Sequence, residues 1–371
     1  MSEKSTERVY RRWSILTLSS TVAVLAVLAA FTAYIDPLFH YHGPLEQFEY
    51  PLNSDDRYQN SGILRNFEYN GLIIGNSMSQ AFKTSEAEAL FRVPFVKTPF
   101  PSANFQEIND NLEVAYAAGK EIQYVIRSLD FNYRRICKVY SSQDEYRAEL
   151  DMEFPSYLYN SSLIDDVNYV LNKSIFLDRT LWVINFTRSG SQSTTFDNYG
   201  VVDKSGSPRS FNYGAKFVFR HYTLGEPYNS APMSDEMRQT IIRNIRQNVT
   251  DLADAHPETT FYLFFPPYSI CYWDLQQNAG AVDLHIDVAQ VVIEELLKHS
   301  NINFYSFFTN YDLICDLNNY WDYGHYGEWV NSWILEQMHS GNYLLTEDNY
   351  LEHLDAMREF YNSYDYASLH N

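Results

Sequence analysis

Short apolar runs alternate with amphipathic stretches along most of this chain, and this alternation constrains its fold more than any other feature. The apolar runs are rich in β-branched and aromatic residues and lie at residues 72–75, 93–98, 124–126, 261–265 and 302–308. Stretches with helical periodicity lie between or after them, at residues 102–119, 234–252, 284–296 and 330–338. Strand and helix in alternation predict an α/β fold, with a parallel sheet covered by helices on both faces. Such sheets bind ligands at the carboxyl ends of their strands.

The interval from about 138 to 232 breaks this alternation. It contains Pro155 and Trp182, a Ser-, Gly- and Thr-rich stretch at 189–195 and a turn at 205–208. We interpret the interval as a long insertion that covers one edge of the sheet as a lid.

The N-terminal segment predicts a membrane anchor. The run from Trp13 to Ile35 contains no charged residue and exceeds the roughly 20 helical residues that cross a hydrocarbon core. Lys and Arg residues precede the run and Asp follows it, so the positive-inside rule places the N-terminus in the cytoplasm. A cleaved signal peptide is the alternative, but its apolar region would normally be only about 7–15 residues long. We therefore expect a single-pass protein of the cell membrane, with a cytoplasmic tail at 1–12, a transmembrane helix at 13–35 and an extracytoplasmic domain at 36–371.

Composition favours a folded domain without a nucleic-acid partner. The chain has 371 residues, 45% of them hydrophobic and 20% charged, so a well-filled core is expected. The formal net charge of -20 argues against nucleic acid, because counterion release requires clustered Lys and Arg. It also argues against peripheral adhesion to anionic lipid. Aromatic residues make up 16%, which fits core and strand filling and, as the alternative, the lining of a carbohydrate site.

Neither the cysteines nor the histidines form a metal-binding pattern of high specificity. Cys137, Cys271 and Cys315 lack CxxC spacing, which disfavours structural zinc; buried thiols are the favoured interpretation and one disulfide is the alternative. Asp36 and two nearby histidines fit either a metal site or, as we favour, a turn punctuated by Pro and Gly. Neither G-x-G-x-x-G nor G-x-x-x-x-G-K-[ST] occurs, so we expect no metal and no nucleotide cofactor.

Three residues far apart in the sequence have the chemistry of a serine hydrolase. An apolar run ends in Gly75-Asn76-Ser77, which predicts a strand that breaks into a turn with an exposed serine. Late in the chain, Asp322 precedes His325 by three residues, just before an amphipathic helix. A serine hydroxyl is a weak nucleophile that needs a neighbouring base, itself oriented by a carboxylate. Each motif alone fits an ordinary turn or helix cap equally well, so the prediction depends on the three groups meeting in space.

Together, in this order and on an alternating fold, these motifs resemble the SGNH/GDSL hydrolase superfamily. That family has a nucleophilic Ser after its first strand and an Asp-x-x-His near its C-terminus, on a flavodoxin-like three-layer α/β/α fold. The resemblance covers residues 68–135 and 232–340. The anchor, the missing standard motif and the long insertion make the chain most similar to the cell-envelope branch, which includes DltD-like and alginate-O-acetylation-like proteins. The resemblance implies Ser77 as nucleophile, His325 as general base and Asp322 as the group that orients the base.

The chain departs from the family pattern around the oxyanion hole. Gly-Asn-Ser replaces the usual Gly-Asp-Ser, and the family's Gly-x-Asn-Asp block aligns with residues 127–130, where Leu stands in place of the hydrogen-bonding Asn. The stretch 102–104 lies where the family has the glycine of its second block. By the resemblance, the oxyanion and substrate-binding groups are the backbone N–H of Met78, the side chain of Asn104, and Asp130.

The resemblance implies a membrane-anchored serine esterase or O-acyltransferase that acts on an acylated cell-envelope glycan. The alternative is a non-catalytic binding or assembly component of envelope polymer biosynthesis that keeps the fold. The partners implied are an acylated glycan or acyl donor at the membrane surface and a membrane-bound acyltransferase.

Overall fold

The computed structural model describes residues 3–52, 56–131, 136–150, 154–201, 211–227 and 229–370. These residues form two compact units. The anchor unit comprises the described residues of Met1–Leu52 together with Arg57–Asn66 and Phe154–Thr194. The sheet unit comprises the described residues of Phe67–Glu153 and Thr195–Asn371, with Asp56.

A five-stranded parallel sheet forms the centre of the sheet unit. Its strands are β1 (Gly71–Gly75), β2 (Phe95–Pro99), β3 (Tyr124–Ser128), β4 (Thr260–Phe265) and β5 (Ile302–Ser306). They are ordered β2-β1-β3-β4-β5, and Gly71 of β1 lies opposite Phe95 of β2 and Tyr124 of β3. All residues of β1 and β2 are buried, as expected for strands covered on both faces. This order is that of flavodoxin-like folds, which bind ligands where the strand order reverses, here between β1 and β3.

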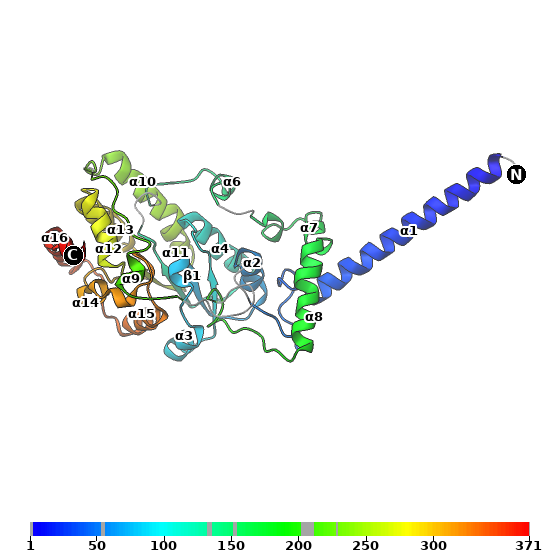
Figure 1. Ribbon diagram of the computed structural model, residues 1–371, viewed down its shortest axis with the longest axis horizontal. Helices are drawn as coiled ribbons and strands as arrows, with labels where there is room; N and C mark the ends of the chain where they lie inside the picture. Colours follow the sequence, from blue (N-terminus) through cyan, green and yellow to red (C-terminus); the bar gives the residue numbers. More distant parts are fainter. Residues whose placement is uncertain are drawn as a thin grey trace. The chain divides into compact units, whose positions relative to one another are not determined.

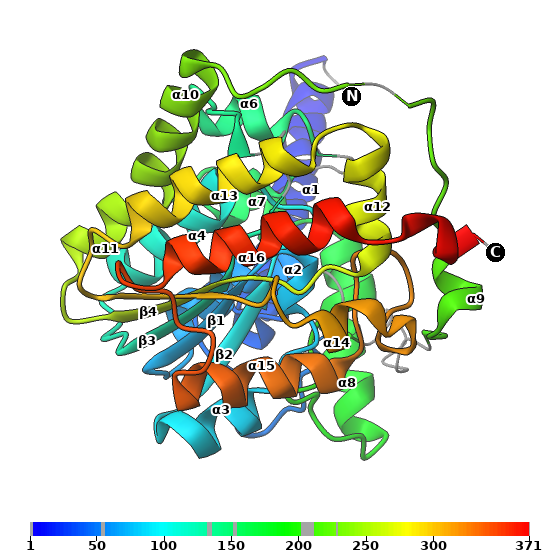
Figure 2. The same ribbon diagram turned by 90° about the vertical axis from the view of Figure 1, so that its left-hand side faces the viewer.

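Helices cover both faces of the sheet (Figure 2). On one face lie α4 (Phe105–Ala117), α10 (Asp235–Ile245) and α13 (Val282–Leu296), and on the other lie α3 (Thr84–Phe91) and α15 (Glu328–Ser340). Side-chain caps set two of the helix starts. Asn104 accepts a hydrogen bond from the N–H of Glu107, and Ser234 accepts one from the N–H of Met237. The three-layer α/β fold expected from the sequence is therefore confirmed.

Further elements complete the sheet unit. They are η1 (Ser77–Ser79), α6 (Gln143–Arg147), α9 (Ala215–Val218), η4 (Arg246–Thr250), α11 (Asp251–Ala255), α12 (Ile270–Asn278), α14 (Tyr311–Cys315), η5 (Leu317–Asn319), α16 (Tyr350–Ser363) and η6 (Tyr366–His370). The last long helix, α16, packs against α12 and α13. Its Tyr361 ring stacks on Trp273 at 3.8 Å between centroids, and Arg358 donates to Asp283 and Asp287. Cys137, Cys271 and Cys315 are free thiols.

Two of the element boundaries that differ from those expected have a clear local cause. The strand expected at 93–98 begins at Phe95, because Arg92 adopts the left-handed conformation (φ 63°) that ends α3. The helix expected at 102–119 begins at Phe105, because Asn104 is extended and caps the helix.

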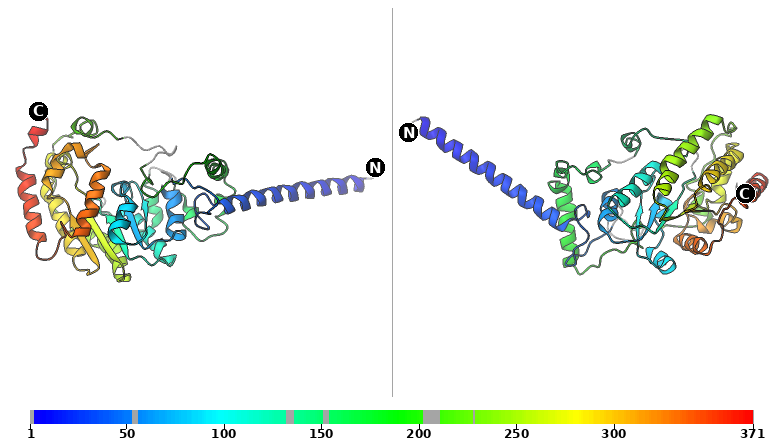
Figure 3. Two further views of the ribbon diagram at one scale, coloured as in Figure 1. Left: turned by 90° about the horizontal axis from the view of Figure 1, so that it is seen from below. Right: turned by 180° about the vertical axis from the view of Figure 1, so that it is seen from behind.

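The anchor unit contains one helix that is long and apolar enough to cross a membrane. This helix is α1 (Glu3–Ile35). The other elements of the anchor unit are α2 (Asp56–Asn66), η2 (Ser156–Leu158), α7 (Val167–Val170), η3 (Ile175–Thr180) and α8 (Leu181–Arg188). Figures 1 and 3 show α1 as a single straight helix, with α7 and α8 beside its C-terminal end. A small core of Leu38, Leu158, Tyr169 and Ile175 joins the residues after α1 to the 154–194 segment. The interval 138–232, interpreted from the sequence as one insertion, is therefore divided: this core draws 154–194 into the anchor unit.

The Asp36 region forms a turn. The Asp36 carboxylate accepts hydrogen bonds from the backbone N–H groups of His40, Tyr41 and His42, at 2.7–2.9 Å, and from the hydroxyl of Tyr169. Burial raises the pKa of Asp36, although these hydrogen bonds favour its charged form. Among the described residues, no group of three or more His, Cys, Asp or Glu side chains is arranged to hold a metal ion.

Candidate active site

Ser77 stands directly beyond the carboxyl end of β1, where the backbone turns sharply. Gly75 has φ 153°, and a Cβ there would collide with the hydroxyl groups of Ser79 and Ser128, so only glycine fits this turn. Asn76 accepts a hydrogen bond from the N–H of Met78 at 3.0 Å and starts the 3₁₀ turn η1. The strand end and this cap together fix the backbone that carries Ser77.

Asp322 and His325 lie in a loop between η5 and α15 that the aspartate itself organises. One carboxylate oxygen of Asp322 accepts the backbone N–H groups of Gly324 (2.7 Å) and His325 (2.6 Å). The other accepts a hydrogen bond from Nδ1 of His325 at 2.7 Å. Burial disfavours the charged carboxylate, but the hydrogen bonds outweigh it and lower the pKa of Asp322. Asp322 therefore remains a carboxylate and fixes Nδ1 of His325 as the protonated ring nitrogen.

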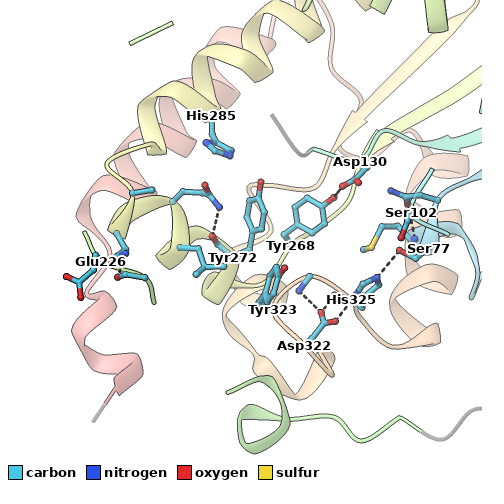
Figure 4. Close-up of a pocket in the computed structure, with 18 residues that line it drawn as sticks. Ser77, Ser102, Asp130, Glu226, Tyr268, Tyr272, His285, Asp322, Tyr323 and His325 are labelled. Atoms are coloured by element: carbon cyan, nitrogen blue, oxygen red, sulfur yellow. Dashed lines mark hydrogen bonds and ion pairs between the residues drawn. The ribbon is translucent and has the colours of Figure 1, made fainter. Parts of the chain in front are cut away.

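The serine and the histidine meet although 248 residues separate them. Ser77 Oγ lies 2.8 Å from His325 Nε2, and Figure 4 shows the series Ser77–His325–Asp322 along one side of a cavity. The ring of Trp321 stacks on the imidazole at 5.0 Å between centroids and restricts its rotation. The Oγ–Nε2 distance lies within the roughly 2.6–3.2 Å that a hydrogen bond between a nucleophile and its base requires, and Asp322 lies on the far side of the imidazole.

One contact that the sequence did not suggest holds the two segments together. Asn331, buried on α15, donates from Nδ2 to the backbone carbonyl of Met78 at 3.0 Å. This bond joins the helix that follows His325 to the turn that carries Ser77. The only signal in the sequence was a polar residue beside the apolar face of a predicted helix, which is too common to be diagnostic.

Two cavities open from Ser77 and His325. The first has a volume of about 550 Å³ and is lined mainly by polar and tyrosine side chains; these include Asp130, Glu226, Tyr268, Tyr272, Gln276, Asn278, His285 and Tyr323. The second has a volume of about 610 Å³, and its lining includes the aromatic side chains of Phe211, Tyr213, Trp321, Tyr326 and Trp329. Ser77 thus lies where the two cavities meet.

The expected oxyanion groups are only partly where they are needed. The N–H of Met78 donates to Asn76 and is therefore engaged within the turn. Asn104 lines neither cavity, and its side-chain oxygen caps α4. Asp130 borders the first cavity, but its carboxylate accepts a hydrogen bond from the hydroxyl of Tyr268 (Figure 4). The side-chain oxygen of Asn104 caps α4, and an oxyanion role for its amide N–H group stays a prediction.

Ser102 is a residue of the site that sequence reasoning named only as part of a stretch. It borders both cavities, as Ser77 does, and it adopts the left-handed conformation with φ 63°. Within the described part of the chain, the backbone N–H groups of Ser77 and Ser102 have no hydrogen-bond acceptor. Both amide donors therefore remain available at the site.

No protein-family model matches the chain, and no curated protein matches it. A solved structure from Streptococcus pneumonia, provisionally described as that of a platelet activating factor, is similar at 10% sequence identity and a TM-score of 0.39. The similarity covers 78% of this chain and 92% of the other.

Proposed function

We propose that this protein is a membrane-anchored serine esterase or O-acyltransferase of the SGNH type. The observation that carries the proposal is the hydrogen-bonded series from Ser77 through His325 to Asp322, with distances of 2.8 and 2.7 Å. A base within hydrogen-bond reach of a hydroxyl, and a carboxylate that orients the base, are what a serine needs to act as a nucleophile near neutral pH.

The reaction would proceed in two acyl-transfer steps. Ser77 Oγ attacks the carbonyl carbon of an ester while its proton passes to His325 Nε2. The tetrahedral intermediate then collapses, the leaving alcohol takes that proton, and the acyl group remains on Ser77. In the second step, His325 accepts a proton from water or a sugar hydroxyl, whose oxygen attacks the acyl carbonyl. The bond between the acyl carbon and Ser77 Oγ then breaks, and His325 Nε2 returns the proton to Oγ. Asp322 keeps its negative charge throughout and stabilises the imidazolium that forms in each step.

The developing oxyanion would be stabilised by backbone amides. The N–H groups of Ser77 and Ser102 belong to residues that border both cavities and are not engaged elsewhere. Preorganised donors of this kind typically contribute about 10²–10³-fold to the rate each.

The substrate we propose is an acylated glycan or an acyl donor at the outer membrane surface. Aromatic and polar linings of the two cavities suit sugar rings and their hydroxyl groups, and α1 would hold the protein near such substrates. A membrane-bound acyltransferase is the partner that would supply activated acyl groups there.

The central test is the hydrolysis of 4-nitrophenyl acetate by the full chain and its variants. Ser77→Ala and His325→Ala are each expected to reduce kcat by about 10³-fold or more. The double variant should lose little beyond either single one, because members of a triad act as a unit. Ser340→Ala, which changes an exposed serine at the end of α15, is the matched control and should retain full activity.

Labelling with a fluorophosphonate probe separates this proposal from the alternative of a non-catalytic binding or assembly component. A base-activated Ser77 should form a phosphonyl adduct that mass spectrometry locates on that residue, and the adduct should be absent in His325→Ala. An unlabelled Ser77 in folded protein, together with unchanged hydrolysis by Ser77→Ala, would favour the non-catalytic alternative.

A further inference from the structure

The segment from residue 163 to residue 177 of the anchor unit exposes an unusual number of apolar side chains. Leu163 and Ile164 are 82% and 83% exposed, well beyond what a soluble surface normally gives to such side chains. Further exposed members are Val167, Leu171 and Leu177. These exposed apolar side chains extend from the approach to α7 into η3, with exposed polar residues such as Asn168 and Lys173 between them.

This segment packs against the C-terminal end of α1. Both α7 and η3 contact α1, and the rings of Phe31 and Phe176 lie 6.2 Å apart. On α1, Thr32 and Ile35 are completely buried by these contacts and by the turn that follows. Figures 1 and 3 show α8, which continues from η3, crossing the end of α1 instead of running along it. If α1 crosses a bilayer, this arrangement lies along the bilayer surface.

The exposed part of α1 is too short to span a bilayer unaided. Its charge-free run begins at Trp13, and its residues are uniformly exposed only as far as residue 27. These fifteen residues, at about 1.5 Å each, extend about 22 Å, whereas a hydrocarbon core is about 30 Å thick. The remaining thickness must include the last two turns of α1, which are the turns that α7 and η3 contact.

Exposed aromatic residues lie near both ends of the expected membrane-spanning part of α1. Trp13 is 66% exposed and Tyr34 is 55% exposed, and such side chains concentrate at membrane–water interfaces. Twenty-one helical steps separate them, or about 31 Å, which matches the hydrocarbon thickness. Phe31 then lies about one helical turn inside the outer boundary, and its contact Phe176 lies at a similar depth.

We propose that the segment 163–177 enters the outer leaflet of the bilayer beside α1, with its exposed apolar side chains in contact with lipid. The occupant of this surface is lipid and not a second protein, because Phe176, at one end of the segment, contacts Phe31 on the part of α1 that must lie within the hydrocarbon core. The anchor unit therefore has two membrane contacts, a spanning helix and a segment immersed in the interface. The proposal depends on α1 spanning the membrane and is independent of the chemistry at Ser77.

Collision-rate measurements on nitroxide labels test this placement. The full chain is reconstituted at one copy per phosphatidylcholine nanodisc and labelled at Ile164→Cys or Leu177→Cys. The matched controls are Asn160→Cys and Asp178→Cys, which replace exposed polar residues just before and just after the segment. Val24→Cys on α1 reports lipid exposure of the anchor itself. The unsubstituted chain is the blank for the native cysteines.

The expected result is a ratio of oxygen to water-soluble nickel-chelate collisions that is several-fold higher at Ile164 and Leu177 than at the two controls. Frequent nickel collisions at both apolar positions, with lipid exposure retained at Val24, would overturn the proposal while leaving the anchor intact. Infrequent collisions with both reagents would indicate protein coverage and would overturn it as well. Carbene labelling of the unsubstituted chain from within the lipid phase gives the same answer without any substitution, since only lipid exposure would label peptides from 163–177.

Discussion

At the scale of single residues, Asp322 has two separable roles. One carboxylate oxygen closes the turn by accepting the N–H groups of Gly324 and His325, and the other accepts Nδ1–H of His325. The first role requires only an oxygen acceptor, which an amide also provides. The second requires a negative charge beside the imidazole. Substitution by asparagine therefore separates the structural role from the electrostatic one.

We expect Asp322→Asn to fold normally and to lose about 10³–10⁴-fold in kcat on 4-nitrophenyl acetate, because an amide cannot hold the productive tautomer of His325. The matched control is Asp316→Asn, since Asp316 likewise accepts a backbone N–H in a loop turn but lies away from the imidazole. Steady-state kinetics and a thermal melt check both expectations. Retention of kcat within tenfold in Asp322→Asn would remove the orienting role.

At the scale of elements, a buried lysine on β2 holds the chain that follows η1. Lys97 donates from Nζ to the carbonyls of Gln80 (2.6 Å) and Phe82 (2.7 Å), and more distantly to that of Asp197. Burial lowers the pKa of Lys97 to about 7, against the opposing attraction of the Asp197 carboxylate. The turn that presents Ser77 is thus fixed by a strand side chain whose charge changes near neutral pH.

Lys97 should make the stability of the sheet unit depend on pH. In the unfolded chain a lysine keeps its proton up to about pH 10.4, whereas in the fold Lys97 releases it near pH 7. Between these values the unfolded state binds more protons, so the free energy of unfolding rises with pH from about 7 to 9.5. Urea unfolding across this range is expected to show this rise in the wild type and to lack it in Lys97→Met.

Lys97→Met should also be less stable overall, because up to three carbonyls lose a donor at a cost of about 1–3 kcal/mol for each group left unsatisfied. Lys216→Met, which replaces an exposed lysine of α9, should keep both the wild-type stability and the pH slope. If the free energy of unfolding of Lys97→Met rose with pH as steeply as that of the wild type, the pH dependence would belong to other groups.

At the scale of the whole molecule, the topology follows from the charges around α1. Basic residues, including Arg11 and Arg12, precede the apolar run, and Asp36 follows it. The positive-inside rule then predicts that residues 1–12 stay in the cytoplasm and that the sheet unit, together with the part of the anchor unit that follows α1, lies outside. The net charge of -20 is consistent with an external domain that stays in solution beside an anionic surface.

Protease added to intact spheroplasts is expected to digest the sheet unit and leave a small fragment containing α1. A tag at the N-terminus should remain protected until the membrane is lysed, and a cytoplasmic marker protein serves as the control for leakage. Full protection of the sheet unit before lysis would reverse the predicted orientation.

Much of the fold could be predicted from local patterns. The strands at 124–126 and 261–265 were apparent because both faces of a parallel strand are buried, which leaves an uninterrupted apolar run. The turn at Ser77 and the Asp322–His325 pair were equally local, since one requires a glycine after a strand and the other a spacing of three residues. These features depend on short-range sterics and hydrophobic burial, which can be inferred from a short stretch of sequence.

What only the tertiary structure decided concerns groups that compete for partners. The sequence could not show that Asn331 would bond to Met78, or that Asn76 would take the Met78 amide and leave those of Ser77 and Ser102 available. Nor could it show that 154–194 would join the anchor unit. Each outcome depends on contacts between segments that are distant in sequence. Which acceptor a hydrogen-bond donor binds depends on which acceptors the folded chain brings within reach. The sequence alone therefore determined the residue types and their local turns. The packed fold decided which side chains come together and which hydrogen-bond donors stay available.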